Sequence, residues 1–529
     1  MTTLETRGAP GAVETLADLD EDARNLRFQR LQKRMGAVWD SMKLDLDDES
    51  VVVIPSVSLN LTTAGSGSMM QAMEERFLFL LLLLRQPRLR MIYVTSMPID
   101  PRIIEYYLAL LPGVIPSHAL ARLSTLSVGD ISPRPLSQKL LERPRLLAKI
   151  AGMIPNRARS HLIHYNTTEL ERDIALTLGI PMYGADPRLA ELGSKTGCRR
   201  LFSEVGVRHP LGFENLHTLE EVASAAGDIL LTRPTVRQVI VKLNEGVSGS
   251  GNALVDLGSI TSLPESERPA EILQRVLRMR LESPKVPFDE YVAKLQSDGG
   301  IVEERIVGEE VLSPSVQMRI RPDGSVELLS THDQLLGGAT GQSYLGCTFP
   351  ADPAYSRLIS EPAMAIGERL ATQGVLGRFA VDFIVVRDSA GAWSEYAIEL
   401  NLRKGGTTHP FLTLQFLTDG RYDPETGRFL TPDGAVKHLA ATDHLEADAL
   451  RAISVGDLFD VVARHGLHFD QSRQVGIVFH MISSITEHGR VGMTAVGDTA
   501  AQAMQLYGRA QEVLLAEARR AGEERALPE

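Results

Sequence analysis

Two apolar segments that carry acidic side chains constrain most strongly what this chain can fold into and bind. Residues 381–386 (VDFIVV) and 395–403 (EYAIELNLR) read as strands, and the intervening RDSAGAW supplies turn residues. If the segments pair as a hairpin, Asp382 lies across from Glu399, and Asn401 points to the same face as Glu399. Magnesium prefers such oxygen ligands and usually shares them with substrate phosphates. The hairpin therefore predicts a magnesium–nucleotide site, and the alternative is that these acids face solvent.

Length, charge and composition indicate which broad class of protein this chain belongs to. A chain of 529 residues is long enough for several domains. Its net charge of −12 argues against nucleic acid as a partner. The longest apolar run, residues 77–84, is too short to cross a bilayer, and the first residues lack a secretory pattern. With only two cysteines, the chain is expected to be a cytoplasmic protein that does not enter membranes.

The two ends of the chain differ in their patterns. Residues 51–56 (VVVIPS) and 91–96 (MIYVTS) flank the helical segment EERFLFLLLLLRQ, which predicts a βαβ unit within an open α/β domain. Residues 448–519 predict a small α+β appendage that either covers a substrate site or mediates dimerisation. The fold class is therefore a multidomain combination of α/β and α+β units.

Two lysines precede the acidic hairpin. Lys195 opens the helical segment KTGCRRLFSEVG, and Lys242 lies within the strand QVIVKL. A glycine- and serine-rich loop at residues 246–251 follows, and its backbone N–H groups can close over phosphates. A lysine buried without a partner is costly, and an anionic ligand beside the loop would remove that cost. The alternatives are a solvated helix lysine and an ordinary hairpin with an edge-strand lysine.

Taken in order, these motifs resemble the ATP-grasp superfamily over residues 195–406. The resemblance implies that ATP binds with one or two Mg²⁺ ions held by Asp382, Glu399 and Asn401. It also implies that Lys195 and Lys242 contact the phosphates. The implied nucleotide-binding residues further comprise the lid residues Gly246, Ser248, Gly249, Ser250 and Gly251, the adenine-hinge residues Glu303, Glu304 and Ile306, and Glu310 for the ribose.

The resemblance also implies a domain division. Residues 1–190 would form the N-terminal α/β domain, and residues 191–265 the small ATP-grasp subdomain with its lid. Residues 266–440 would form the large subdomain with the hinge and the metal site. Residues 441–529 would form the C-terminal α+β domain.

Further motifs resemble the pheganomycin peptide ligase family across nearly the whole chain: YVTSMPIDPRIIEYYL, GQSYLGCTFPA, ELNLRKGGTTHP and GIVFHMISSITEHGRVGMTAVGD. This resemblance implies an ATP-dependent peptide ligase of bacterial natural-product biosynthesis. Such an enzyme joins an amino-acid-like carboxylate to an amine or peptide acceptor through an acyl phosphate, releasing ADP and phosphate. A homodimer is compatible with the sequence. The alternatives are a small-molecule kinase on the same fold and a non-catalytic nucleotide-binding protein.

In a ligase, a cation or N–H donors must stabilise the oxyanion that forms when the amine attacks. Arg403 is the first candidate, together with the amides of Gly405 and Gly406. Arg319 and Arg378 are alternatives for binding the substrate carboxylate, because a guanidinium group matches a carboxylate in shape. Each of these arginines could instead be structural.

Three histidines are candidates for binding or deprotonating the acceptor amine. His332 and His409 could assist deprotonation of the incoming amine, and His480 could line the acceptor site. The plain alternative for His332 is a polar residue at a strand end. The glycine-rich residues 337–346 are expected to form a mobile loop near the acceptor.

Overall fold

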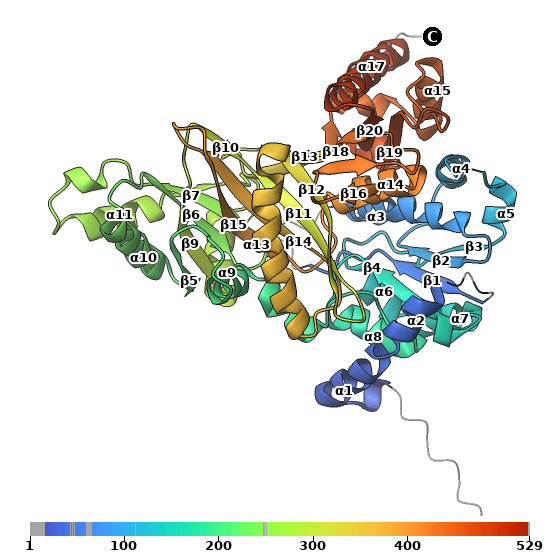
Figure 1. Cartoon of the computed structure of the whole chain (residues 1–529), viewed down its shortest axis with the longest axis horizontal. Coiled ribbons are helices and arrows are strands. Elements are labelled where there is room, and N and C mark those ends of the chain that lie inside the picture. Colours follow the sequence, from blue (N-terminus) through green and yellow to red (C-terminus); the bar gives the residue numbers. More distant parts are fainter. Residues whose placement is uncertain are drawn as a thin grey trace, which may run out of the picture.

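The computed structural model describes residues 16–526, except residues 43, 45, 47, 60–65, 112, 247, 248 and 250. Figure 1 shows the N-terminal domain (blue to teal), the small subdomain projecting to one side (green), a central sheet (yellow to orange) and a C-terminal region (orange to red) that lies against the N-terminal domain. Among the described helices, none is long and apolar enough to cross a membrane.

The N-terminal domain is built on a four-stranded parallel sheet in the order β3-β2-β1-β4. The predicted βαβ unit is confirmed, because β1 and β2 pair in parallel on either side of α3 and the 3₁₀ helix η2. Nearly all of η2 is buried, as expected for a helix that is apolar all round. The bounds are α1 Glu21–Gln32, α2 Met35–Met42, β1 Ser50–Ile54, α3 Gly67–Glu75, η2 Arg76–Arg85, β2 Arg90–Thr95, α4 Pro101–Ala109, α5 Pro116–Leu120, β3 Leu123–Ser127, α6 Leu136–Leu141, α7 Pro144–Met153, β4 Ser160–His164 and α8 Glu169–Leu178.

The small subdomain has a five-stranded sheet in the order β5-β9-β6-β7-β8. Because β8 and β9 hydrogen-bond to β7 and β6, the subdomain continues to Glu304. The predicted boundary after residue 265 is therefore wrong, since it would cut through one sheet. The bounds are α9 Lys195–Glu204, β5 Gly212–Leu216, α10 Leu219–Thr232, β6 Gln238–Leu243, β7 Asn252–Asp256, α11 Arg268–Val276, β8 Arg280–Leu281, α12 Phe288–Asp298 and β9 Gly300–Glu304.

The central sheet has nine strands, of which eight run in the order β10-β14-β11-β12-β13-β18-β20-β19 while β15 pairs with β14. The C-terminal strands thus extend the sheet that carries the acidic hairpin. The predicted boundary at residue 441 falls inside β18 and is also wrong. The bounds are β10 Glu310–Leu312, β11 Pro314–Ile320, β12 Val326–Gly337, β13 Ser343–Phe349, α13 Pro353–Thr372, β14 Gly377–Arg387, β15 Trp393–Asn401, α14 Thr408–Thr418, β16 Arg421–Asp423, β17 Arg428–Leu430, β18 His438–Glu446, α15 Val455–Arg464, β19 Gly476–His480, α16 Ser484–His488, β20 Arg490–Gly497 and α17 Ala500–Ala526.

One apolar core joins the two ends of the chain. It includes Leu80 of η2 and Tyr107 of α4 together with Phe479, Met493 and Leu514 of the C-terminal region. A buried hydrogen bond from the Tyr107 hydroxyl to the Phe479 carbonyl, 3.1 Å long, crosses the same contact. Because this core is shared, the C-terminal region is an integral part of the fold and not a peripheral appendage.

Candidate active site

A cleft of about 930 Å³ lies between the small subdomain and the central sheet. Its volume is in the usual range for a small-molecule site. The strands of both sheets contribute side chains to its wall, as does the turn that follows β15. Of the site residues predicted from the sequence, the cleft is lined by Lys242, Gly249, Glu303, Glu304, Ile306, Asp382, Glu399, Asn401, Arg403, Gly405 and Gly406.

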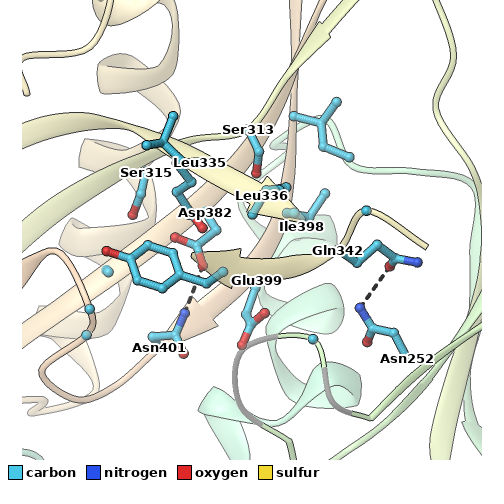
Figure 2. A pocket seen from close by; sticks show the side chains of 18 of the residues that line it. Asn252, Ser313, Ser315, Leu335, Leu336, Gln342, Asp382, Ile398, Glu399 and Asn401 are labelled. Carbon is cyan, nitrogen blue, oxygen red and sulfur yellow. Dashed lines mark hydrogen bonds between the residues drawn. The ribbon is translucent and has the colours of Figure 1, made fainter. Parts of the chain in front are cut away.

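The acidic hairpin places three oxygen-bearing side chains together. Asp382 of β14 is directly opposite Glu399 of β15, in the predicted register. Asn401 Nδ2 donates a hydrogen bond to Asp382 Oδ2 at 3.1 Å. Figure 2 shows these three side chains grouped together at one side of the cleft.

The three side chains fit a magnesium ion. Burial and the neighbouring Glu399 raise the pKa of Asp382 to about 6. Burial opposes ionisation of Glu399 as well, but Lys195 lowers its pKa below the usual value. Two partly buried carboxylates facing one another are a costly arrangement that a divalent cation relieves, and their oxygens are the ligand type that Mg²⁺ takes.

The raised pKa of Asp382 predicts that metal affinity depends on pH. A metal binds the ionised carboxylate, so protons compete with it below pH 6. With a pKa near 6, we expect Mn²⁺, used in place of Mg²⁺ and without nucleotide, to bind about 4-fold more weakly at pH 5.5 than at pH 7.5. Titration followed by electron paramagnetic resonance measures this. Asp382→Asn should weaken binding and flatten the dependence, and equal wild-type affinities at the two pH values would contradict the assignment.

Both predicted phosphate lysines are anchored near the cleft. Lys195, the first residue of α9, forms an ion pair with Glu399 at 2.6 Å. Lys242 of β6 pairs with Glu303 of β9 at 2.5 Å. The structure thus provides the partner that a buried strand lysine requires, and Lys242 also reaches the cleft surface.

The predicted lid is the connection between β6 and β7, which pair as the expected hairpin. Gly249 has a φ of +78°, and a Cβ there would lie 2.5 Å from the Gln342 carbonyl oxygen, so a glycine is required by both conformation and space. Gly246 and Gly251 are at the two ends of the loop. Ser248 and Ser250 lie outside the described residues. Asn252 Nδ2 donates to Gln342 Oε1 at 2.8 Å, joining the base of the lid to the β12–β13 turn, as Figure 2 shows.

The predicted hinge is only partly assembled at the cleft. Glu303, Glu304 and Ile306 line it. The Glu303 carboxylate is an ion-pair partner of Lys242 and of Arg199, at 3.1 Å from the latter, and is only 2% exposed. Glu310 does not line the cleft, and its carboxylate instead pairs with Arg387 of β14 at 2.8 Å. The prediction that Glu310 contacts a ribose is therefore not supported by its position, because side chains alternate along β10 and the neighbouring Val311 takes the cleft side.

The three candidate arginines lie in different places. Arg403 lines the cleft, and its Nη1 donates to the Tyr165 hydroxyl at 3.3 Å. Arg319 and Arg378 are cross-strand neighbours outside the cleft. Arg319 Nε donates to Glu327 at 2.7 Å, and its guanidinium covers the ring of Trp39. The prediction that Arg319 or Arg378 grips the substrate is therefore wrong, because both lie where the sheet meets the N-terminal domain.

Other predicted contributors also turn out to be structural. His332 is fully buried, bonded to Ser330 and packed on Phe349, so it does not reach an incoming amine. The amide of Gly405 donates to the Thr408 hydroxyl at 2.9 Å, which removes it as an oxyanion donor. Within residues 337–346, only residues 338–342 form a turn, and the rest belongs to β12 and β13.

Sequence reasoning missed four side chains at the end of the cleft nearest Arg403: Arg76, Tyr165, Asp443 and Arg490. Together with Arg403 they form what we call the arginine end. Arg76 Nη1 is 2.7 Å from Asp443 Oδ2, and Arg490 Nε donates to the Asp443 carbonyl at 2.7 Å. The available signal was the charge of Arg76 beside the longest apolar run. Nothing in the sequence indicated that residues so far apart would meet.

Comparison with known proteins bears on this geometry. An IQCH-like ATP-grasp family model matches residues 187–282 and 270–425, and a PGM1 C-terminal domain model matches residues 457–510. The L-propargylglycine–L-glutamate ligase of Streptantibioticus cattleyicolor is 28% identical over 451 residues, spanning 83% of this chain and 89% of that protein. The IQ motif-containing protein H of Danio rerio is 22% identical, over 80% of this chain and 44% of that protein.

A solved structure supports the fold. The ADP complex of N5-carboxyaminoimidazole ribonucleotide synthetase superposes with a TM-score of 0.50 at 11% identity, covering 88% of this chain and 97% of that one. At this identity the match speaks to the fold alone. The family model therefore assigns an ATP-grasp domain to residues 187–425, and the superposition agrees with that fold.

Proposed function

We propose that this protein is an ATP-dependent carboxylate–amine ligase that forms an amide bond between amino-acid-like substrates. The observation that carries the proposal is the grouping of Asp382, Glu399 and Asn401 with Lys242 and Arg403 in one cleft. The similarity to an amino-acid ligase over most of both chains supports it. A non-catalytic nucleotide-binding protein would have no need of such a complete set.

In the first step, a carboxylate oxygen of one substrate attacks the γ-phosphorus of ATP, and the bond from that phosphorus to the β–γ bridging oxygen breaks. ADP leaves and an acyl phosphate forms. Such a transfer depends mainly on positioning and charge neutralisation. Lys195 and Lys242 are suited to neutralise the phosphates. Mg²⁺ held by Asp382, Glu399 and Asn401 would supply further positive charge.

In the second step, the amine nitrogen of the acceptor attacks the acyl carbon, and the bond from that carbon to the phosphate oxygen breaks. Phosphate leaves, and the nitrogen gives up a proton. The carbonyl oxygen carries negative charge in the transition state. Arg403 lines the same cleft as the metal ligands, and its contact with Tyr165 holds the guanidinium in place.

Product stoichiometry tests the proposal. With Mg-ATP and a panel of amino acids, each offered with and without a second amino acid or short peptide, we expect equal amounts of ADP and free phosphate only when both partners are present. Mass spectrometry should show a product equal to the two substrates minus one water.

Two results would overturn the proposal. ADP formed without free phosphate, beside a product heavier by one phosphoryl group, would identify a kinase. Nucleotide binding with no turnover across a panel that includes the substrates named for the Streptantibioticus relative would favour a binding protein.

A further inference from the structure

Three potential metal ligands converge behind the arginine end of the cleft. They are His409 in the first turn of α14, Asp443 in the middle of β18 and His480 at the end of β19. His480 Nε2 lies 2.7 Å and His409 Nε2 lies 3.2 Å from the same oxygen, Asp443 Oδ1. The two Nε2 atoms are 3.1 Å apart. All three side chains are at most 5% exposed.

Hydrogen bonds alone do not satisfy this triangle of His409, Asp443 and His480. If both imidazoles carry a hydrogen on Nε2, two donors face one another at 3.1 Å. If one imidazole lacks that hydrogen, its lone pair faces the ionised Asp443 oxygen across about 3 Å.

We propose that His409 Nε2, His480 Nε2 and Asp443 Oδ1 bind a divalent first-row transition metal, with Zn²⁺ the best fit. Two imidazoles and one carboxylate are a usual set for such ions, and a tetrahedral site with bonds of about 2.0–2.1 Å puts its ligand atoms about 3.3 Å apart. The distance between the two Nε2 atoms, 3.1 Å, and the distance from His409 Nε2 to Asp443 Oδ1, 3.2 Å, are both close to that value. The distance from His480 Nε2 to Asp443 Oδ1 is shorter, at 2.7 Å. The His480–Asp443 pair would open slightly around the ion.

The surroundings of the triangle suit a metal centre. Arg76 holds the second oxygen of Asp443 at 2.7 Å, which leaves Oδ1 to face the imidazoles. Residue 492 is glycine, and a Cβ there would lie 2.1 Å from His480 Nε2, so no larger residue leaves room for the ring. Asp443 also lines the cleft, so the three ligands lie directly behind the cleft wall. This site is separate from the oxygen-only site at Asp382 and Glu399.

The test uses the full-length protein and requires no substrate, so it is independent of the proposed ligase reaction. We expect protein purified without chelators to carry about one Zn²⁺ per chain by plasma mass spectrometry. After removal of the metal, Co²⁺ should give the visible absorption of a four-coordinate site. His480→Gln keeps a side-chain donor for Asp443 but loses the imidazole, and it should weaken binding by more than the roughly 10–100-fold that loss of an outer-shell partner costs.

His332→Gln is the matched control, because His332 is equally buried but lies apart from this group. It should keep its metal. Folded wild-type protein without Zn²⁺ and without the Co²⁺ absorption would overturn the proposal and leave a hydrogen-bonded triangle. Equal metal content in wild type and His480→Gln would place the metal elsewhere. Should His480→Gln not fold, the Co²⁺ spectrum of the wild-type protein decides the question alone.

Discussion

Glu399→Gln should lower the turnover number by about 10³-fold while leaving the fold intact. The substitution removes a negative oxygen ligand from the proposed magnesium site and the partner of Lys195 at once. A metal ion supplies several kcal/mol of transition-state stabilisation, and each 1.4 kcal/mol corresponds to a factor of ten in rate. Single-turnover ADP formation, with circular dichroism as a check on folding, measures the effect. Asn401→Ala should reduce the rate in the same direction.

Glu395→Gln is the matched control for this change. Glu395 is on the same strand but does not line the cleft, so its variant should keep turnover within about twofold of the wild type, as surface changes usually do. Near-normal turnover in both Glu399→Gln and Asn401→Ala would contradict the assignment of these residues as magnesium ligands.

Arg403→Ala should lower amide formation by about 10²–10³-fold, the loss typical for removal of one donor to a developing oxyanion. The KM for ATP should change much less, because Arg403 is proposed to act at the acyl carbon and not on the nucleotide. Arg403→Lys should recover only part of the rate, since an ammonium group cannot reproduce the planar guanidinium. Steady-state rates of amide and ADP formation separate these effects.

Arg319→Ala is the control for Arg403. Arg319 was a candidate for binding the substrate carboxylate, but it packs on Trp39 and pairs with Glu327 outside the cleft. We expect its variant to form amide at close to the wild-type rate. A loss as large as that of Arg403→Ala would show that the cleft-based assignment of the two arginines is mistaken.

Local patterns predicted the parts of the site that lie close together in the sequence. The register of Asp382 and Glu399 followed from strand alternation and a short turn, and the Lys242 hairpin followed from a glycine-rich loop between two apolar runs. The βαβ unit of the N-terminal domain was predictable for the same reason. In each case neighbouring residues determine both the pairing and the face on which a side chain lies.

Features that depend on distant contacts were not predictable in this way. Glu310 and Val311 differ by one position, and only the pairing of β10 with β14 decides which of them faces the cleft. The sequence left Arg319 as an alternative for binding the substrate carboxylate, and only the folded sheet shows that it packs beside Trp39. The division at residue 265 failed because β9 returns to pair with β6 after two intervening helices. A local sequence pattern does not show which distant strands will pair.

The arginine end of the cleft has a consequence for how the protein is made. It combines Arg76 from the start of η2, Arg403 after β15 and Arg490 at the start of β20. During synthesis, the first domain leaves the ribosome long before the strands that complete this wall. No partly synthesised chain can therefore hold a finished substrate site. The enzyme becomes competent only when β18 to β20 have joined the central sheet and closed the core that both ends of the chain share.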